Sequence, residues 1–190
     1  RVATTRVFPD IFQEMSIRRL APFFGKFRKM FQGLNPAADG LVGILTPGPM
    51  NEGYFEHTYI ARFLGLMLLE GEDLTVQEGQ LTAKTVDGLL PLRVVWRRID
   101  GIYTDPLELK ENSRLGTPGL LGAIRKKEVT VVNALGSGVL ESRVWSAFLP
   151  ELCKVLLHEE LKLTNLQSFW WGDPEFQSRF SDEKNNWMIT

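Results

Sequence analysis

The spacing of hydrophobic positions changes along the chain. From residue 1 to 35 the large apolar side chains recur at intervals of three and four, which is typical of amphipathic helix, and Pro22 is expected to break it. From Leu41 onward short continuous apolar runs replace that spacing, as in strands buried on both faces. The composition of residues 35–40 predicts a linker between the two patterns.

Residues 41–69 are predicted to form a strand–loop–helix–strand unit. The expected elements are a strand at 41–45, a helix at about 54–63 with Asn51 as its N-cap and Gly65 at its end, and a strand at 66–69. A parallel pair with a right-handed crossover is the natural arrangement of such a unit.

The rest of the chain is predicted to add a hairpin, further strands and short helices. The alternation over residues 73–88 predicts a β-hairpin that turns at Glu78–Gly79. The other expected elements are a strand at 92–96, a helix at 120–126 capped by Thr117 or Ser113, a strand at 129–133, helices at about 141–148 and 151–158 on either side of Pro150, and a tail from 165 that is loop with one edge strand.

Apolar strands that alternate with helices indicate an α/β fold: a mainly parallel sheet flanked by helices, with a β-hairpin and a helical N-terminal lead-in. We expect a lead-in and linker at 1–40, an α/β domain at 41–163 and an irregular tail at 164–190. Ligands of such sheets collect at the carboxyl ends of the strands. Polar loops are expected there at 46–52, 97–105 and 133–138.

Composition and charge exclude several classes of protein. The 190 residues are 44% hydrophobic and 24% charged, which is globular rather than disordered. The formal net charge of −1 gives no general footprint for nucleic acid, and no apolar run reaches the length of a membrane span, so we expect neither partner. A single cysteine, Cys153, excludes a disulfide scaffold, and with only two histidines an all-His/Cys zinc site is excluded.

Three groups of residues are candidates for chemistry, and each has a structural alternative. Glu56 and His57 are either a pair that faces the cleft above the sheet or a dipole-stabilised Glu beside an interfacial His. Arg98 either grips a carboxylate or phosphate, held by Asp100 or Asp105, or forms a local ion pair. The third group, Gly136-Ser137-Gly138, either cradles an anion at a helix start or is a plain turn.

Other features favour a structural or binding role. The basic stretch at 18–29 is either a solvated helix face or a surface for a partner. Cys153 is expected in the core and His158 at a helix end. A hydrolase that uses Glu56 and His57 is disfavoured, because no Ser or Cys stands in a recognisable nucleophile elbow.

Taken together and in order, the loops resemble the circularly permuted ATP-grasp family, the proteins similar to glutathionylspermidine synthase. The resemblance runs from about Leu41 to Leu163. The segments that carry it are LTPG at 45–48, YFEH at 54–57, LEGEDL at 69–74, RRID at 97–100, DP at 105–106, LGTPGL at 115–120 and NALGSGV at 133–139.

This resemblance implies an ATP-dependent carboxylate–amine or carboxylate–thiol ligase fold, in which a carboxylate is activated as an acyl phosphate. The family's nucleotide-binding halves would lie before Arg1 and after the tail. The chain is then similar to a central pre-ATP-grasp domain that shapes the substrate site, inactive alone, in a longer, cytoplasmic protein. We expect no cofactor in this part, ATP and Mg²⁺ in the full-length protein, and a small-molecule or peptide substrate.

By resemblance, the substrate-binding residues are Glu56, His57, Arg98, Asp100, Asp105, Asn133, Gly136, Ser137 and Gly138. Arg98 would pair with an anionic group, which Asn133 and the amides of Gly136–Gly138 would orient. No metal ligands and no catalytic residue are assigned.

The chain departs from the family pattern at two places. Gly101 stands where the family has a second acid, and Glu141-Ser142-Arg143 stands where it has an acidic pair and Lys. The alternative function is a non-catalytic binding or scaffolding module, which docks a partner through the 18–29 stretch or through Trp170, Trp171 and Trp187.

Overall fold

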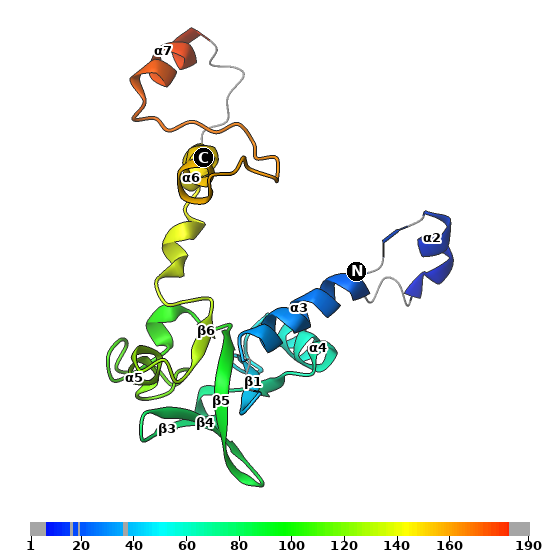
Figure 1. Ribbon diagram of the computed structural model, residues 1–190, viewed down its shortest axis with the longest axis vertical. Helices are drawn as coiled ribbons and strands as arrows, with labels where there is room; N and C mark the ends of the chain where they lie inside the picture. The colour runs from blue at the N-terminus through cyan, green and yellow to red at the C-terminus, as the bar shows by residue number, and fades with distance from the viewer. Residues whose placement is uncertain (1–6, 16, 19, 36–37, 183–190) are drawn as a thin grey trace. The chain divides into compact units, whose positions relative to one another are not determined.

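The computed structural model describes residues 7–15, 17–18, 20–35 and 38–182. Arg19, Trp187 and part of the predicted linker lie outside the described residues. The elements, in which η marks a 3₁₀ helix, are α2 (Pro9–Glu14), α3 (Ala21–Gly33), β1 (Leu41–Leu45), α4 (Tyr54–Leu64), β2 (Met67–Leu69), η1 (Gly71–Asp73), β3 (Leu74–Gln77), β4 (Gln80–Thr85), β5 (Gly88–Arg97), η2 (Gly101–Tyr103), α5 (Leu120–Arg125), β6 (Thr130–Val132), η3 (Ser137–Glu141), α6 (Trp145–Leu157) and α7 (Pro174–Asp182) (Figure 1).

A six-stranded mixed sheet organises the first part of the chain. Its order is β2-β1-β5-β4-β3, and β6 also pairs with β5. Strand β1 is parallel to β2 and β5, and β5 is parallel to β6, whereas β3, β4 and the start of β5 form an antiparallel meander. The predicted α/β class with a mainly parallel sheet and a hairpin is therefore confirmed.

Helices cover both faces of the sheet, as Figure 1 shows. On one face α3 and α4 pack against β5, through a core that includes Phe31, Leu64 and Val94. On the other face α5 packs over the hairpin in a larger core that includes Leu120 and Val95. Because side chains alternate along a strand, consecutive residues of β5 contribute to opposite cores.

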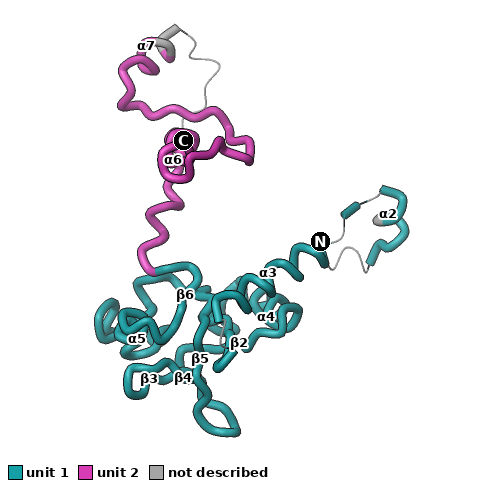
Figure 2. The backbone as a smooth tube through the Cα atoms, in the orientation of Figure 1, with its two compact units in different colours: residues 1–134 teal, residues 135–190 magenta. Residues whose placement is uncertain are grey.

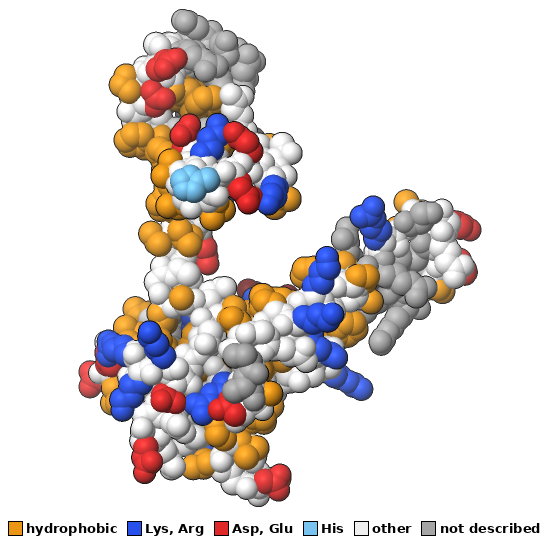
Figure 3. All heavy atoms as spheres, in the orientation of Figure 1, with side chains coloured by type: hydrophobic (Ala, Val, Ile, Leu, Met, Phe, Trp, Pro, Cys, Tyr) orange, Lys and Arg blue, Asp and Glu red, His pale blue; other side chains and the backbone are white. Residues whose placement is uncertain are grey.

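Helix α3 uses its aromatic side chains to join the sheet. Phe24 lies 4.7 Å from Phe63 of α4 between ring centroids, and Phe27 lies 5.1 Å from Trp96 of β5. Arg28 Nη2 donates to the backbone oxygen of Phe63 at 2.8 Å, and Lys26 and Lys29 are exposed. Figure 3 shows Lys and Arg side chains along this helix.

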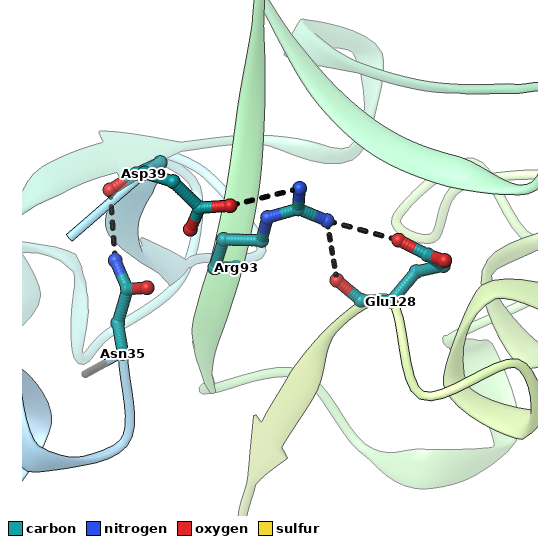
Figure 4. A network of polar contacts seen from close by, with 5 residues as sticks. Asn35, Asp39, Arg93 and Glu128 are labelled. Carbon is teal, nitrogen blue, oxygen red and sulfur yellow. Dashed lines mark hydrogen bonds and ion pairs between the residues drawn. The ribbon is translucent and has the colours of Figure 1, made fainter. Parts of the chain in front are cut away.

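An arginine holds the amino ends of the parallel strands together. Arg93 of β5 forms ion pairs with Asp39, just before β1, at 3.1 Å and with Glu128, just before β6, at 2.9 Å (Figure 4). Asn35 closes the same corner by donating from Nδ2 to the backbone oxygen of Gly40 at 3.0 Å. The polar network lies at the end of the sheet opposite the predicted ligand edge.

Several local predictions were wrong at helix starts. The expected break near Pro22 is present, since α2 ends at Glu14 and α3 begins at Ala21, but Pro22 itself lies in the first turn of α3, where its missing N–H is no loss. Asn51 accepts from the N–H of Gly53 in the preceding turn, and the N-cap of α4 is Gly53. Neither Thr117 nor Ser113 caps α5, because an acidic side chain distant in sequence takes that role.

Predictions for the last third of the chain also need correction. Helix α6 runs through Pro150, although the sequence predicted one helix before this residue and another after it. His158 is the C-cap of α6, as predicted. Cys153 is half-buried rather than a core residue. In the described part of the tail there is no strand, and residues 174–182 form α7.

The chain divides into two compact units, residues 1–134 and 135–190 (Figure 2). The predicted domain boundaries at 40/41 and 163/164 stay predictions. No described helix has the length and apolar character that crossing a lipid bilayer requires.

Candidate functional site

The parallel strands bring three segments to one edge of the sheet. Thr46 follows β1, Glu70 follows β2 and Arg98 follows β5. The sheet hydrogen bonds continue into two of these residues, because Thr46 N donates to the oxygen of Leu69 at 2.8 Å and Arg98 N donates to the oxygen of Leu45 at 2.8 Å. The backbone thus fixes where the side chains of Thr46 and Arg98 begin.

His57 connects two of these strand ends. It lies in the first half of α4 and is buried, with 4% of its surface exposed. Its Nδ1 lies 2.9 Å from Thr46 Oγ1, and its Nε2 lies 3.0 Å from Arg98 Nε. An arginine nitrogen can only donate, so Nε2 accepts, and the ring proton belongs on Nδ1, which donates to Thr46.

Burial and charge keep this imidazole neutral. Burial lowers the pKa of His57 below its ordinary value of 6.5, the nearby Arg98 lowers it further, and Glu56 opposes the shift. A neutral ring is what the geometry needs, since a protonated Nε2 would turn an N–H toward the N–H of Arg98.

Arg98 is held on several sides and retains a free edge. Its Nη2 lies 3.4 Å from Glu56 Oε1, and its guanidinium lies 5.4 Å from the centre of the Trp96 ring. None of the hydrogen bonds among the described residues uses its Nη1. The side chain remains 35% exposed, so an anion in solution can reach it. The exposed ion pair with Glu56 adds little stability of its own.

An aromatic platform supports the guanidinium from below. Trp96 contacts Phe27 at 5.1 Å and Phe31 at 5.6 Å between ring centroids, and both come from α3. Helix α3 therefore belongs to the structure that positions Arg98. The sequence showed its aromatic spacing but not which strand residue it would contact.

The loop after β1 lies against an acidic residue, Glu70, that was not predicted for the site. Gly48 has a φ of +93°, and a Cβ there would stand 2.8 Å from Glu70 Oε2. Glu70 also forms a capping box with Asp73, whose carboxylate accepts from the Glu70 N–H at 2.8 Å. Its position directly after β2 was the signal that could have identified it.

Two of the predicted binding residues have other roles. Asp100 Oδ1 accepts from the N–H of Ile102 at 3.3 Å and caps η2. Asp105 is fully buried and accepts hydrogen bonds from the backbone of the loop and of α5. The expectation that Asp100 or Asp105 holds Arg98 is therefore wrong, because His57 and Glu56 hold it.

The remaining predicted residues follow β6. The backbone oxygen of Asn133 accepts from Arg97 Nε at 3.3 Å, which ties the ends of β5 and β6. Gly136, Ser137 and Gly138 belong to the second unit, where Gly136 has a φ of +83° and begins η3. That these residues orient the same anion stays a prediction.

The described residues contain no group of three or more His, Cys, Asp or Glu that could hold a metal ion. Both ring nitrogens of His57 are engaged, by Thr46 and by Arg98, so the guanidinium of Arg98 is the group that can still bind a ligand here. A guanidinium suits an anion rather than a cation.

Comparison with known proteins places this chain in a family. Residues 1–190 match the family model described as circularly permuted ATP-grasp type 2. A protein of Mycobacterium tuberculosis strain H37Rv is 38% identical over 174 residues, which is 90% of this chain and 20% of the relative. A Synechocystis protein is 37% identical over 164 residues, 85% of this chain and 34% of the relative.

A second Mycobacterium tuberculosis protein is 33% identical over 178 residues, 92% of this chain and 32% of the relative. All three relatives carry the name "uncharacterized protein". The chain thus spans between a fifth and about a third of the length of these relatives. The finer likeness to glutathionylspermidine synthase stays a prediction. With a family model matched over its whole length, this chain belongs to the circularly permuted ATP-grasp type 2 family.

Proposed function

We propose that this chain is the substrate-side part of an ATP-dependent carboxylate–amine or carboxylate–thiol ligase, and that Arg98 holds an anionic group of the substrate. Family membership supports the ligase chemistry. The placement of Arg98 at the carboxyl edge of parallel strands supports its role, since this is where α/β sheets bind ligands.

The observation that carries the proposal is the geometry of Arg98. Its cation is held by His57 and Trp96, yet no hydrogen bond among the described residues uses Nη1, and 35% of the side chain is exposed. Charge-assisted hydrogen bonds to a carboxylate or phosphate are among the strong ones in proteins, and a fixed guanidinium loses little entropy in forming them.

ATP and Mg²⁺ enter the proposal through the family. The described residues offer no cluster of acids for a cation, so the donors for the metal are expected in the longer protein. What the residues of this chain can do is bind and orient an anion. In this arrangement the Glu56 carboxylate weakens the attraction between Arg98 and an anion, because it already offsets part of the charge of the guanidinium.

The test is direct binding of a small carboxylate to the 190-residue chain. We expect trifluoroacetate, followed by fluorine NMR, to bind weakly and saturably. Arg98→Gln should weaken this binding about 10- to 100-fold, the usual worth of a charge-assisted hydrogen bond. Glu56→Gln should strengthen it, because the carboxylate that offsets the guanidinium charge is gone.

The matched control is Arg114→Gln, which removes the same charge from an exposed loop residue and should leave the affinity unchanged. Equal loss in both arginine variants would show a general charge effect. Absence of saturable binding in the unaltered chain would contradict the anion site and favour the scaffolding alternative.

A further inference from the structure

The hydrogen bonds of Arg98 divide its guanidinium into a used edge and an open edge. Nε donates to His57 Nε2 at 3.0 Å, and Nη2 on the same side lies 3.4 Å from Glu56 Oε1. The opposite edge, formed by Nη1 and the second N–H of Nη2, has the fork geometry that matches the two oxygens of a carboxylate. The acceptor that binds Nε therefore determines which edge of the guanidinium is left for a ligand.

His57 is unusually constrained as that acceptor. Its ring is buried, and Nδ1 is occupied by Thr46 Oγ1 at 2.9 Å. Thr46 is itself fully buried, and the N–H of Gly48 also donates to its Oγ1 at 3.4 Å. A Cβ on Gly53 would stand 3.1 Å from His57 Nε2, so the residue at the start of α4 lies close beside the ring.

We propose that His57 is the positioning residue of this site: as a neutral imidazole it holds Arg98 by Nε, so that the Nη1–Nη2 edge receives a carboxylate end-on, and protonation of His57 releases the arginine. This inference rests on the proposed function, since it concerns the same anion site. It assigns His57 a role through Arg98 and not in direct contact with the substrate.

The charges around the ring set the direction of the pH dependence. Arg98 faces His57 from the end of β5, and Glu56 is its neighbour on α4. Thr46, from the end of β1, is uncharged, Glu70 lies across the loop at Gly48, and Arg28 of α3 is engaged with the backbone of Phe63. Burial and Arg98 outweigh Glu56 and lower the pKa of His57.

The sign follows from that lowered pKa. Above about pH 6.5 the ring is neutral in both the folded and the unfolded chain, so its contribution to stability and to anion binding is complete. As the pH falls below that value, the unfolded chain takes up the proton first, and stability declines. Anion binding is lost as the pH falls through the lowered folded-state pKa.

The experiment measures trifluoroacetate affinity by fluorine NMR from pH 7.5 down to the pH at which nitrogen NMR shows the His57 ring to be protonated, because this probe keeps its charge over that range. The unaltered chain should bind with constant affinity near pH 7.5 and lose affinity as His57 takes up its proton. His57→Gln, whose amide oxygen can accept from Arg98 Nε, should stay within about threefold at pH 7.5 and lose the pH dependence. His57→Leu, which fills the space without an acceptor, should bind at every pH about tenfold more weakly than the unaltered chain binds at pH 7.5.

Two further readouts separate positioning from folding. Thermal unfolding shows which variants remain folded, and nitrogen NMR of the unaltered chain should show a neutral His57 with its proton on Nδ1 at pH 7. A proton on Nε2 would overturn the proposal without any variant.

The failures are distinguishable. If the unaltered chain does not bind trifluoroacetate, the proposed function fails together with this inference. If binding occurs and Arg98→Gln abolishes it, yet His57→Leu binds normally or His57→Gln keeps the full decline in acid, only the role of His57 is refuted.

Discussion

Replacing Asp105 with alanine should lower the free energy of unfolding by about 3 kcal/mol or more. The carboxylate is completely buried and accepts from Leu107 N at 2.9 Å, Gly119 N at 3.2 Å and Leu121 N at 2.9 Å. Alanine would leave three backbone donors without their acceptor, and each such loss costs about 1–3 kcal/mol before the structure relaxes. Chemical denaturation of the two chains measures the difference.

Two variants define the controls for Asp105. Asp105→Asn retains one acceptor oxygen and should lose less than alanine, whereas Asp87→Ala at an exposed turn should change stability by less than about 0.5 kcal/mol. A stable Asp105→Ala protein that has lost only anion affinity would instead restore the sequence prediction of a substrate-binding carboxylate.

Replacing Trp96 with alanine should lower the free energy of unfolding by about 2–3 kcal/mol and also weaken anion binding. Truncating a fully buried Trp to alanine lowers the free energy of unfolding by about 3–5 kcal/mol. Trp96 is half-buried, so a smaller loss is expected. The variant removes the contacts with Phe27 and Phe31 of α3 and the surface under Arg98. Denaturation and the trifluoroacetate titration report the two effects separately.

Trp96→Phe tests whether an aromatic face is sufficient at this position. It should recover much of the stability and most of the affinity, because a smaller ring still packs on α3 and faces the cation. Unchanged affinity in Trp96→Ala would mean that His57 and Glu56 alone hold Arg98. The platform would then have only a structural role.

The sheet was predictable where local pattern decided the structure. The apolar run Leu41–Leu45 predicts a buried strand, and β1 is present at those residues. The alternation on either side of Glu78–Gly79 predicts a hairpin, and β3 and β4 pair there. Gly65 ends α4 in the left-handed conformation that favours glycine. These features depend on residues close together in sequence.

Predictions were wrong where distant residues decide. The cap of α5 comes from Asp105, which is 14 residues before Gly119 in the chain. Strand β5 begins at Gly88 rather than near Leu92, because its first residues pair with β4 before the strand continues beside β1. The spacing of hydrophobic residues contains no signal for such changes of partner.

The candidate site shows the same division. The sequence places Glu56 and His57 on the helix after β1 and Arg98 at the end of β5, so they were expected on the same edge of the sheet. The structure brings these three side chains together. Asp100 stands two residues from Arg98 in the chain and yet caps a turn, because local backbone donors are closer to its carboxylate. Thr46 contacts His57 and Trp96 lies against the guanidinium of Arg98, and residue type alone did not predict either contact.

The most direct test of the central claim is nitrogen–proton NMR of the chain during a trifluoroacetate titration. If the ends of β1 and β5 and the start of α4 form one anion site, the Arg98 Nε–H and the His57 ring signals should shift together. They should saturate with the affinity that fluorine NMR gives. Shifts confined to exposed basic residues such as Lys26 and Lys29, with Arg98 and His57 unmoved, would contradict the account.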